Sequence, residues 1–194
     1  GTGIWDQNAN ETVDWIANPV RKGVDDLGRI YGVQYTAMSD KRVVSTRESL
    51  NEHIAKGYEE VLHDPAKGAW LVERKINQLE KALRTILTNP SDRRIIVSAW
   101  RPDELDLMAL PPCPMDYRYI AFEKSKELHM IMTQRSWDMF LGFNIPTAAL
   151  FLEVMARLSG YKAATITCQF ANAHVYANHR AAVEEMLTRD HFAQ

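Results

Sequence analysis

The sequence predicts an α+β fold in which a mixed β-sheet is flanked by helices. Short runs of β-branched and aromatic residues indicate strands, and longer amphipathic segments between them indicate helices. The two kinds of segment follow one another without the regular alternation that builds a doubly wound parallel sheet. With 194 residues, 46% of them hydrophobic, the chain is long and apolar enough to form a sizeable core. We therefore expect a single domain over residues 1–194.

In the first half of the chain, residues 30–35 favour a strand. Further along, Leu50, Ile54, Val61 and Leu62 recur at near-helical spacing, which predicts an amphipathic helix that ends near Asp64-Pro65. A second helix is expected over residues 72–87, because apolar residues share one face there and Asn89-Pro90 follows as a stop signal.

The second half of the chain has clearer patterns. We expect a buried strand over residues 95–100 and two further strands, 117–122 and 128–132, joined by a polar turn. Pro146 suits the first turn of a long apolar helix that reaches about residue 158, with Gly160 closing it. A strand over residues 164–170 and a helix over 177–187 complete the prediction.

Composition limits the possible partners. A formal charge of −2 gives no general attraction to nucleic acid or to an anionic membrane, so an anionic ligand would have to be small and held by a few placed cations. No run of about 18 apolar residues predicts a membrane span, and no signal peptide is recognised. Two cysteines far apart indicate reduced thiols and a cytoplasmic location. His174 and His179 are too isolated from other ligand types to predict a metal site.

Cys113 is the candidate nucleophile. It lies in Leu110-Pro111-Pro112-Cys113-Pro114, where three prolines stiffen the backbone and remove amide donors, so that a thiol would be presented at a fixed angle. The alternative is a small buried core residue, because free cysteine is among the most buried residue types.

Two groups of polar residues are candidates for holding an anion. Arg93 and Arg94 immediately precede a predicted strand and could grip a phosphate, or could be a solvated or Asp-paired edge. The segment Gln134-Arg135-Ser136-Trp137-Asp138 offers a cation near a thiol and groups that orient a polar ligand. Its alternative is a structural Arg–Asp ion pair.

Three further residues could contact a ligand. The amide of Asn144 could bind a lactam edge, where an NH and a C=O adjoin, although the residue taken alone favours an N-cap of the long helix. Alternation places His174 and Tyr176 on one face, where together they could bond a sugar hydroxyl; a structural histidine is the alternative.

Together these segments resemble the thymidylate synthase family over most of the chain outside residues 37–75. Several motifs that occur in the family's order identify the family much more specifically than any one motif does. The matching segments are Ile4-Trp5-Asp6, Asp26-Leu27-Gly28, Tyr31-Gly32, residues 92–100, Glu104-Leu105-Asp106, residues 108–113, Gln134-Arg135-Ser136 with Asp138, residues 141–145, and His174-Val175-Tyr176.

The resemblance implies a thymidylate synthase-like sheet, one face of which forms a homodimer interface. It implies reductive methylation of dUMP to dTMP with methylenetetrahydrofolate as co-substrate and without a metal. Cys113 would add to C6 of the uracil ring, and Tyr31 would assist removal of the C5 proton through ordered water.

The remaining roles also come from the resemblance. Asp138 would contact the folate pterin or the base side, and Trp5 would shield the intermediate from water. The substrate-binding residues would be Arg135 with Ser136 at the phosphate, Arg93 and Arg94 reaching it from the partner subunit, Asn144 at the uracil edge, and His174 with Tyr176 at the deoxyribose 3′-hydroxyl. Gln134 would also belong to the substrate-binding residues.

The chain departs from the family pattern in several places. Pro114 stands where a histidine is usual, and Asn172 where an aspartate is usual. Tyr35-Thr36 replaces a tryptophan–arginine pair, and the stretch from Gly142 to Asn144 is two residues short. Residues 37–75 resemble an insertion, and the family's N-terminal arginine and glutamate segment and its C-terminal closing tail find no match.

Two alternatives follow. A hydroxymethylase of the same family would capture the exocyclic methylene with water instead of hydride, although Asn144 and Trp5 favour uracil methylation. A non-catalytic nucleotide-binding or RNA-binding relative would bind dUMP without forming an adduct. The expected partners are otherwise dUMP, folate and a second copy of the chain, with neither nucleic acid nor membrane.

Overall fold

Hydrogen-bonded ladders group the strands into separate sheets, and these belong to two units of the chain. A computed structural model describes residues 6–190. The first unit comprises residues 1–81 and 101–110, and the second comprises residues 82–100 and 111–194. The helices and mixed sheets confirm the predicted α+β class. The expectation of a single domain stays a prediction.

The first unit contains several short helices and one antiparallel sheet. Its α5 helix continues past Lys81 into the second unit. In chain order the elements are α1 (Asp6–Glu11), α2 (Val13–Ile16), α3 (Gly32–Ala37), β1 (Met38–Val44), α4 (Arg47–Ala55), β2 (Glu59–Asp64), β3 (Ala69–Ile76), α5 (Gln78–Thr88) and the 3₁₀ helix η1 (Pro102–Leu107).

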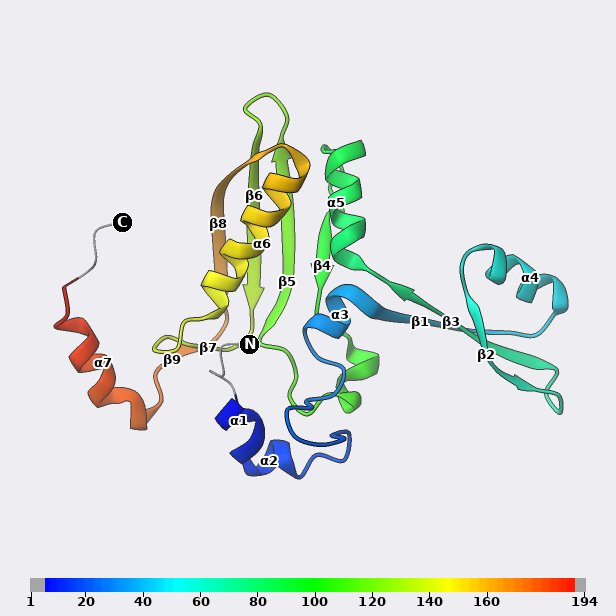
Figure 1. Cartoon of the computed structure of the whole chain (residues 1–194), viewed down its shortest axis with the longest axis horizontal. Helices are drawn as coiled ribbons and strands as arrows, with labels where there is room; N and C mark the ends of the chain where they lie inside the picture. The colour runs from blue at the N-terminus through cyan, green and yellow to red at the C-terminus, as the bar shows by residue number, and fades with distance from the viewer. Residues whose placement is uncertain (1–5, 191–194) are drawn as a thin grey trace. The chain divides into compact units, whose positions relative to one another are not determined.

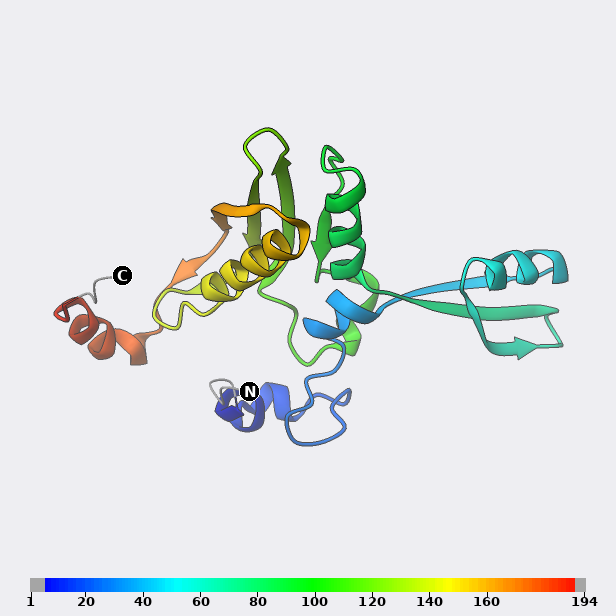
Figure 2. The ribbon, with the colours of Figure 1, turned by 45° about the horizontal axis from the view of Figure 1, so that its top comes forward.

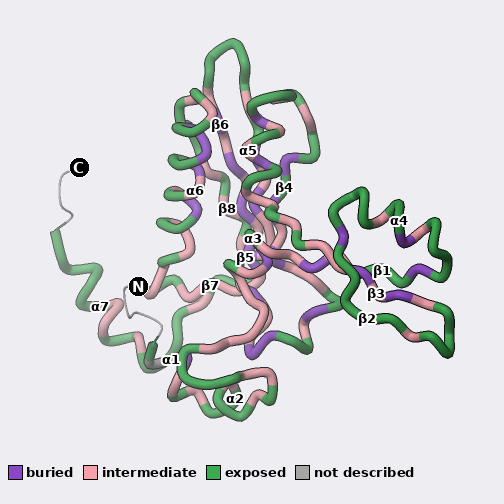
Figure 3. The backbone as a smooth tube through the Cα atoms, turned by 45° about the vertical axis from the view of Figure 1, so that its right-hand side comes forward, coloured by how far each residue is buried: buried purple, intermediate pink, exposed green. Residues whose placement is uncertain are grey.

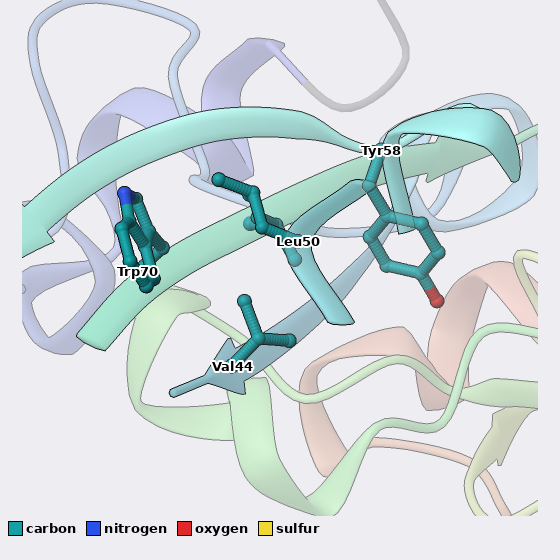
Figure 4. Packing of buried hydrophobic residues seen from close by; sticks show 5 residues of the cluster. Val44, Leu50, Tyr58 and Trp70 are labelled. Atoms are coloured by element: carbon teal, nitrogen blue, oxygen red, sulfur yellow. The ribbon is translucent and has the colours of Figure 1, made fainter. Parts of the chain in front are cut away.

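The sheet of the first unit has the order β1-β3-β2 and is antiparallel throughout. Val72 in the central strand is fully buried, and Leu50 of α4 is 1% exposed. These two side chains pack with Val44, Tyr58 and Trp70 into a cluster of buried residues, most of which Figure 4 labels. Residues 38–76 therefore have a hydrophobic core of their own.

The second unit is built on a four-stranded sheet with the order β4-β5-β6-β8. The β4–β5 and β5–β6 pairs are antiparallel, whereas β6 and β8 are parallel. In chain order the elements are β4 (Ile96–Ser98), β5 (Pro114–Phe122), β6 (Glu127–Gln134), β7 (Trp137–Asp138), α6 (Asn144–Ser159), β8 (Lys162–Phe170), β9 (Ala173–His174), the 3₁₀ helix η2 (Ala177–His179) and α7 (Arg180–Leu187).

Helix α6 connects the parallel strands β6 and β8 and covers one face of their sheet (Figures 1 and 2). Four α6 residues are buried: Ala148, Leu152, Met155 and Ala156. Across from them, Tyr117 of β5 packs edge-on against Phe151, with ring centroids 5.3 Å apart. Gly160 ends the helix at φ 74°, a left-handed conformation that glycine adopts without steric cost, as the sequence predicted.

The two faces of this sheet differ in burial. On the α6 side, alternate β6 residues are buried from Leu128 to Gln134, and Figure 3 shows buried stretches along β6 and α6. The opposite face carries Ile96, Ile120 and Phe122, which are 45%, 42% and 52% exposed. This face of the sheet therefore carries apolar residues that are only partly buried within the second unit.

The helix expected to run from about residue 50 to Asp64-Pro65 is wrong in its second half. Helix α4 ends at Ala55, and Gly57 takes a φ of +82°, the left-handed conformation that commonly closes a helix. Val61 and Leu62 lie in β2 and are 52% and 61% exposed. Val61 and Leu62 therefore do not share a buried helix face with Leu50, although their spacing in the sequence suggested one.

Two further element predictions are corrected. Residues 72–76 belong to β3 rather than to the expected helix over 72–87. The helix begins only after Asn77, whose side chain accepts a hydrogen bond from the Glu80 amide at 3.0 Å and so caps its first turn. Residues 30–35, expected as a strand, form helix α3 from Gly32 onward, and the fully buried Gln34 side chain bonds to the preceding turn. Tertiary contacts override local strand preference there.

Among residues 6–190, we find no helix with the length and apolar character needed to cross a bilayer.

Candidate active site

The Cys113 segment enters strand β5 alongside the end of β6. Pro114 begins β5 and pairs with Gln134, and the Arg135 amide donates to the Cys113 carbonyl at 2.9 Å. Cys113 is partly exposed rather than buried in the core, and neither Cys113 nor Cys168 is in a disulfide. The structure therefore disfavours the alternative of a simple core cysteine.

Arg135 holds the proline-rich segment from one side. Its Nη2 donates to the Pro111 carbonyl at 2.7 Å and its Nε to the Pro112 carbonyl at 3.1 Å. The same Nη2 lies 4.0 Å from the Cys113 Sγ. A guanidinium suits this arrangement because its N–H groups form a rigid fork. The sequence-based alternative of an Arg135–Asp138 ion pair is not found.

Gln134 and Ser136 flank Arg135 with different burial. Gln134 is 1% exposed, and its Nε2 donates to the Ser136 carbonyl at 2.6 Å, which fixes the turn that follows β6. The Gln134 Oε1 is buried without a hydrogen-bond partner among the described residues. Ser136 is half-buried. Both residues thus lie beside Arg135, and the open atom of Gln134 is an acceptor rather than a donor for an anion.

Asp138 and His174 are brought together by a short parallel ladder between β7 and β9, in which they are register partners. The Asp138 Oδ1 accepts a hydrogen bond from the Phe140 amide at 3.0 Å. His174 contacts the Asn172 Oδ1 through Nδ1 at 2.9 Å and meets the Tyr176 ring edge-on, with centroids 4.9 Å apart. His174 and Tyr176 therefore do lie side by side, as alternation along the strand predicted.

His179 belongs to the same cluster, although the sequence patterns did not single it out as a site residue. Its Nδ1 lies 3.2 Å from the Asp138 Oδ2, close enough for an ion pair but not aligned as a hydrogen bond. Its ring also packs against Phe140 and Tyr176, with centroids 5.0 Å and 5.7 Å away. The one feature of the local sequence that could have indicated His179 is its position shortly after His174 and Tyr176.

Asn144 is the first residue of α6 and is half-buried. Phe143 occupies the N-cap position, and no side chain caps the helix there. The expectation that Asn144 acts as an N-cap is therefore wrong. Its amide has no hydrogen-bond partner among residues 6–190, which leaves both its donor and its acceptor open to a ligand.

Arg93 and Arg94 lie in the exposed turn before β4. Arg94 forms hydrogen bonds to both carboxylate oxygens of Asp92, at 3.0 Å and 3.2 Å, and its side chain is 87% exposed. Hydrogen bonds from the Arg94 side chain and amide hold the pKa of Asp92 below its ordinary value. This matches the alternative of an Asp-paired edge for Arg94, whereas Arg93 acts on Asp92 only through its charge and forms no ion pair in the described part of the chain.

Tyr31 lies in the first unit, at the start of α3. It is a non-glycine residue with φ 41° and ψ −102°, which is an unfavourable backbone conformation. Trp5, the other predicted site residue from this part of the sequence, lies outside the described residues. Within residues 6–190, no group of three or more histidine, cysteine, aspartate or glutamate side chains is arranged to hold a metal ion.

Comparison with known proteins gives a consistent result. A family model described as thymidylate synthase matches residues 1–194. The chain is 37% identical to a thymidylate synthase of Bordetella parapertussis over 98% of the chain and 61% of the relative. It is 34% and 33% identical to the thymidylate synthases of Saccharomyces cerevisiae and Homo sapiens, over 98% of the chain and 58% and 54% of those proteins. The chain thus spans about three fifths of the length of the relatives it matches.

Proposed function

Because the chain belongs to the thymidylate synthase family, we propose that the protein methylates dUMP to dTMP, with Cys113 as nucleophile and methylenetetrahydrofolate as co-substrate. The observation that carries this proposal is the Arg135 guanidinium, which is bonded to the carbonyls of Pro111 and Pro112 and lies beside the Cys113 thiol. A thiol on a partly exposed residue, next to a cation, has the properties of an activated nucleophile.

In the proposed reaction, the Cys113 thiolate forms a bond to C6 of the uracil ring. The C5=C6 electrons move toward C5 and the O4 carbonyl, and C5 then attacks the one-carbon unit of the co-substrate. Loss of the C5 proton, elimination of the folate amine and hydride transfer from the folate give the methyl group and dihydrofolate. Departure of Cys113 restores the C5=C6 bond. Tyr31 assists the proton removal through water.

The phosphate of dUMP binds at Arg135 and Ser136, and Gln134 is a further substrate-binding residue whose open Oε1 can only accept a hydrogen bond. The Arg135 Nη1 has no hydrogen-bond partner among the described residues, so it can donate to a phosphate oxygen while Nε and Nη2 keep their carbonyl partners. The binding of one anion and the positioning of Cys113 are therefore assigned to the same side chain.

The base, the sugar and the co-substrate contact the other predicted residues. Asn144 binds the uracil edge with its open amide, and His174 with Tyr176 binds the deoxyribose 3′-hydroxyl. Asp138 contacts the folate, because its Oδ2 is buried without an aligned donor and fits the N–H groups of a pterin ring. Trp5 shields the intermediate from water.

The protein acts as a homodimer in this proposal. The exposed face with Ile96, Ile120 and Phe122 forms the interface, since burying such a face against its copy stabilises a symmetric pair. Arg93 and Arg94 immediately precede β4 of that sheet and reach the partner's phosphate site. We further propose that residues 37–75 are an insertion in one catalytic domain and that the protein is cytoplasmic.

The test uses the full-length protein with methylenetetrahydrofolate and dUMP that carries tritium at C5. Tritium release, a product heavier by one methyl group, and dihydrofolate are expected. A hydroxymethyl product with tetrahydrofolate would make the protein a hydroxymethylase. Bound dUMP without tritium release would instead indicate a non-catalytic relative.

A further inference from the structure

Tyr31 sits in a backbone conformation that the surrounding structure has to enforce. Its φ of 41° and ψ of −102° are rarely adopted by residues other than glycine. Such a conformation persists only where neighbouring contacts over-determine it. The contacts that do so here lie within the first unit, on both sides of Tyr31.

Gln34 supplies the central contact. Its side chain is fully buried, and its Nε2 donates at 2.7 Å to the Arg29 carbonyl and at 2.7 Å to the Glu104 Oε2. Both N–H groups of the amide are thereby used. Because Gln34 is on the first turn of α3 and Arg29 precedes Tyr31, the Gln34 side chain spans the residues on either side of the strained one.

Glu104 anchors this amide from another part of the chain. It is 6% exposed and lies in η1, where its Oε2 also accepts from the Arg29 Nε at 3.0 Å. The Arg29 amide in turn donates to the Leu107 carbonyl at 2.9 Å. The segment before Tyr31 is therefore fixed to η1 through both its backbone and its side chain.

Gly28 allows this close approach. Its φ is +77°, and a Cβ at this position would lie 2.3 Å from the Leu107 carbonyl oxygen. No other residue type therefore fits without moving η1. The turn from Gly28 to Tyr31 is held by backbone contact at its start and by Gln34 at its end.

We propose that Gln34, anchored by Glu104 and Arg29, is a positioning residue that fixes the phenol of Tyr31 for the proton-removal step. The inference rests on the proposed function for the step itself, and on the geometry above for the positioning. A buried amide that donates both to the Arg29 carbonyl and to Glu104 of η1 does more than packing requires, since an apolar side chain of the same volume would fill the space without needing partners.

A double-mutant cycle in the full-length protein tests the catalytic part. Gln34→Leu is expected to lower kcat by at least about tenfold, a fraction of what a general base contributes, with the KM for dUMP changed by less than about twofold. In a Tyr31→Phe background the same change should have little further effect, because the group that it positions is gone. Thr36→Ala, an exposed change on the same helix, is the matched control.

Equal losses from Gln34→Leu in both backgrounds would overturn the proposal, and so would an unchanged kcat in the single variant. The positioning is also measured without turnover, by fluorine NMR of fluorotyrosine-labelled protein with the Tyr31 signal assigned from Tyr31→Phe. Gln34→Leu should shift or split the Tyr31 signal and leave the Tyr161 signal unchanged. An unmoved Tyr31 signal would refute the positioning even if the wild-type protein showed no activity, so failure of the proposed function remains distinguishable.

Discussion

Arg135 donates hydrogen bonds to the carbonyls of the two prolines before Cys113 and places its Nη2 4.0 Å from the Cys113 sulfur. One guanidinium thus fixes the backbone that carries the thiol and supplies the nearby positive charge. The Arg135 amide adds a backbone bond to the Cys113 carbonyl at 2.9 Å. Arg135 therefore contacts the segment of the proposed nucleophile through both its side chain and its backbone.

Replacing Arg135 by lysine should disturb both roles, because an ammonium cannot reproduce the two carbonyl bonds of the fork. We expect the Kd for dUMP to rise by about tenfold or more, equivalent to about 1.4 kcal/mol. Alkylation of Cys113 by iodoacetamide should slow several-fold. Calorimetry and mass spectrometry measure the two effects, with the exposed Arg157→Lys as control. Unchanged binding and alkylation would show that the guanidinium geometry is unimportant.

Asp138 should matter for the folate more than for the nucleotide. Asp138→Asn removes the charge facing His179, and we expect the KM for methylenetetrahydrofolate to rise by about tenfold while that for dUMP changes less. His179→Gln should give a smaller effect of the same kind, and the two changes should not be additive. His53→Gln, in α4, serves as control. Steady-state kinetics with each substrate varied would contradict this if only the dUMP KM rose.

Glu104 should make stability depend on acid pH. Burial alone raises the pKa of Glu104, but hydrogen bonds from Gln34 and Arg29 outweigh it and hold the pKa below the ordinary value of 4.5. A lowered folded-state pKa stabilises the fold above pH 4.5, and this contribution is lost as the pH falls through the folded-state pKa. Glu104→Gln should cost about 1.5–3 kcal/mol at pH 7.

Urea unfolding at several pH values measures this effect. Other carboxylates also titrate in this range, so the informative quantity is the difference in unfolding free energy between the wild type and Glu104→Gln. That difference should shrink below pH 4.5. The exposed Glu153→Gln should differ little from wild type at any pH. A difference that stays constant down to pH 3 would show that the Glu104 charge does not contribute.

Shortening a buried side chain in the core of residues 38–76 should destabilise the β1-β3-β2 sheet and leave the other sheet unchanged. Leu50 is 1% exposed, and Leu50→Ala should destabilise this part by about 2–5 kcal/mol. Hydrogen exchange should then accelerate in β1, β2 and β3 and remain slow in β5 and β6. Ile54→Ala on the same helix, at a residue that is 49% exposed, is the control. Equal acceleration in both sheets would mean that the two unfold together.

The fold could be predicted best where burial and sequence pattern coincide. Strands β5 and β6 and helix α6 follow the predicted limits closely, because Tyr117, Met130 and Leu152 face one buried layer. Between residues 50 and 76 the pattern misled, since Val61 and Leu62 are exposed apolar residues. Gly57 lies between α4 and β2, and Asn77 lies between β3 and α5. Reading these two residues as helix boundaries would have given the correct limits for both helices.

The site could be predicted only in part for a similar reason. Cys113, Arg135 and Asp138 stand in dense local motifs, which sequence inspection detects. Gln34 and His179 do not, because their partners Glu104 and Asp138 are distant in the chain and meet them only through the folded structure. No local spacing indicates such contacts.

The most direct measurement of the central claim is the site of covalent attachment. Full-length protein is incubated with methylenetetrahydrofolate and 5-fluoro-dUMP, whose fluorine cannot leave C5 as a cation, so that the adduct persists. Peptide mass spectrometry should find the nucleotide and folate on Cys113, with no adduct in Cys113→Ser and an undiminished adduct in Cys168→Ser. An adduct on Cys168, or bound nucleotide with no covalent attachment in the wild type, would contradict the assignment of Cys113 as the nucleophile.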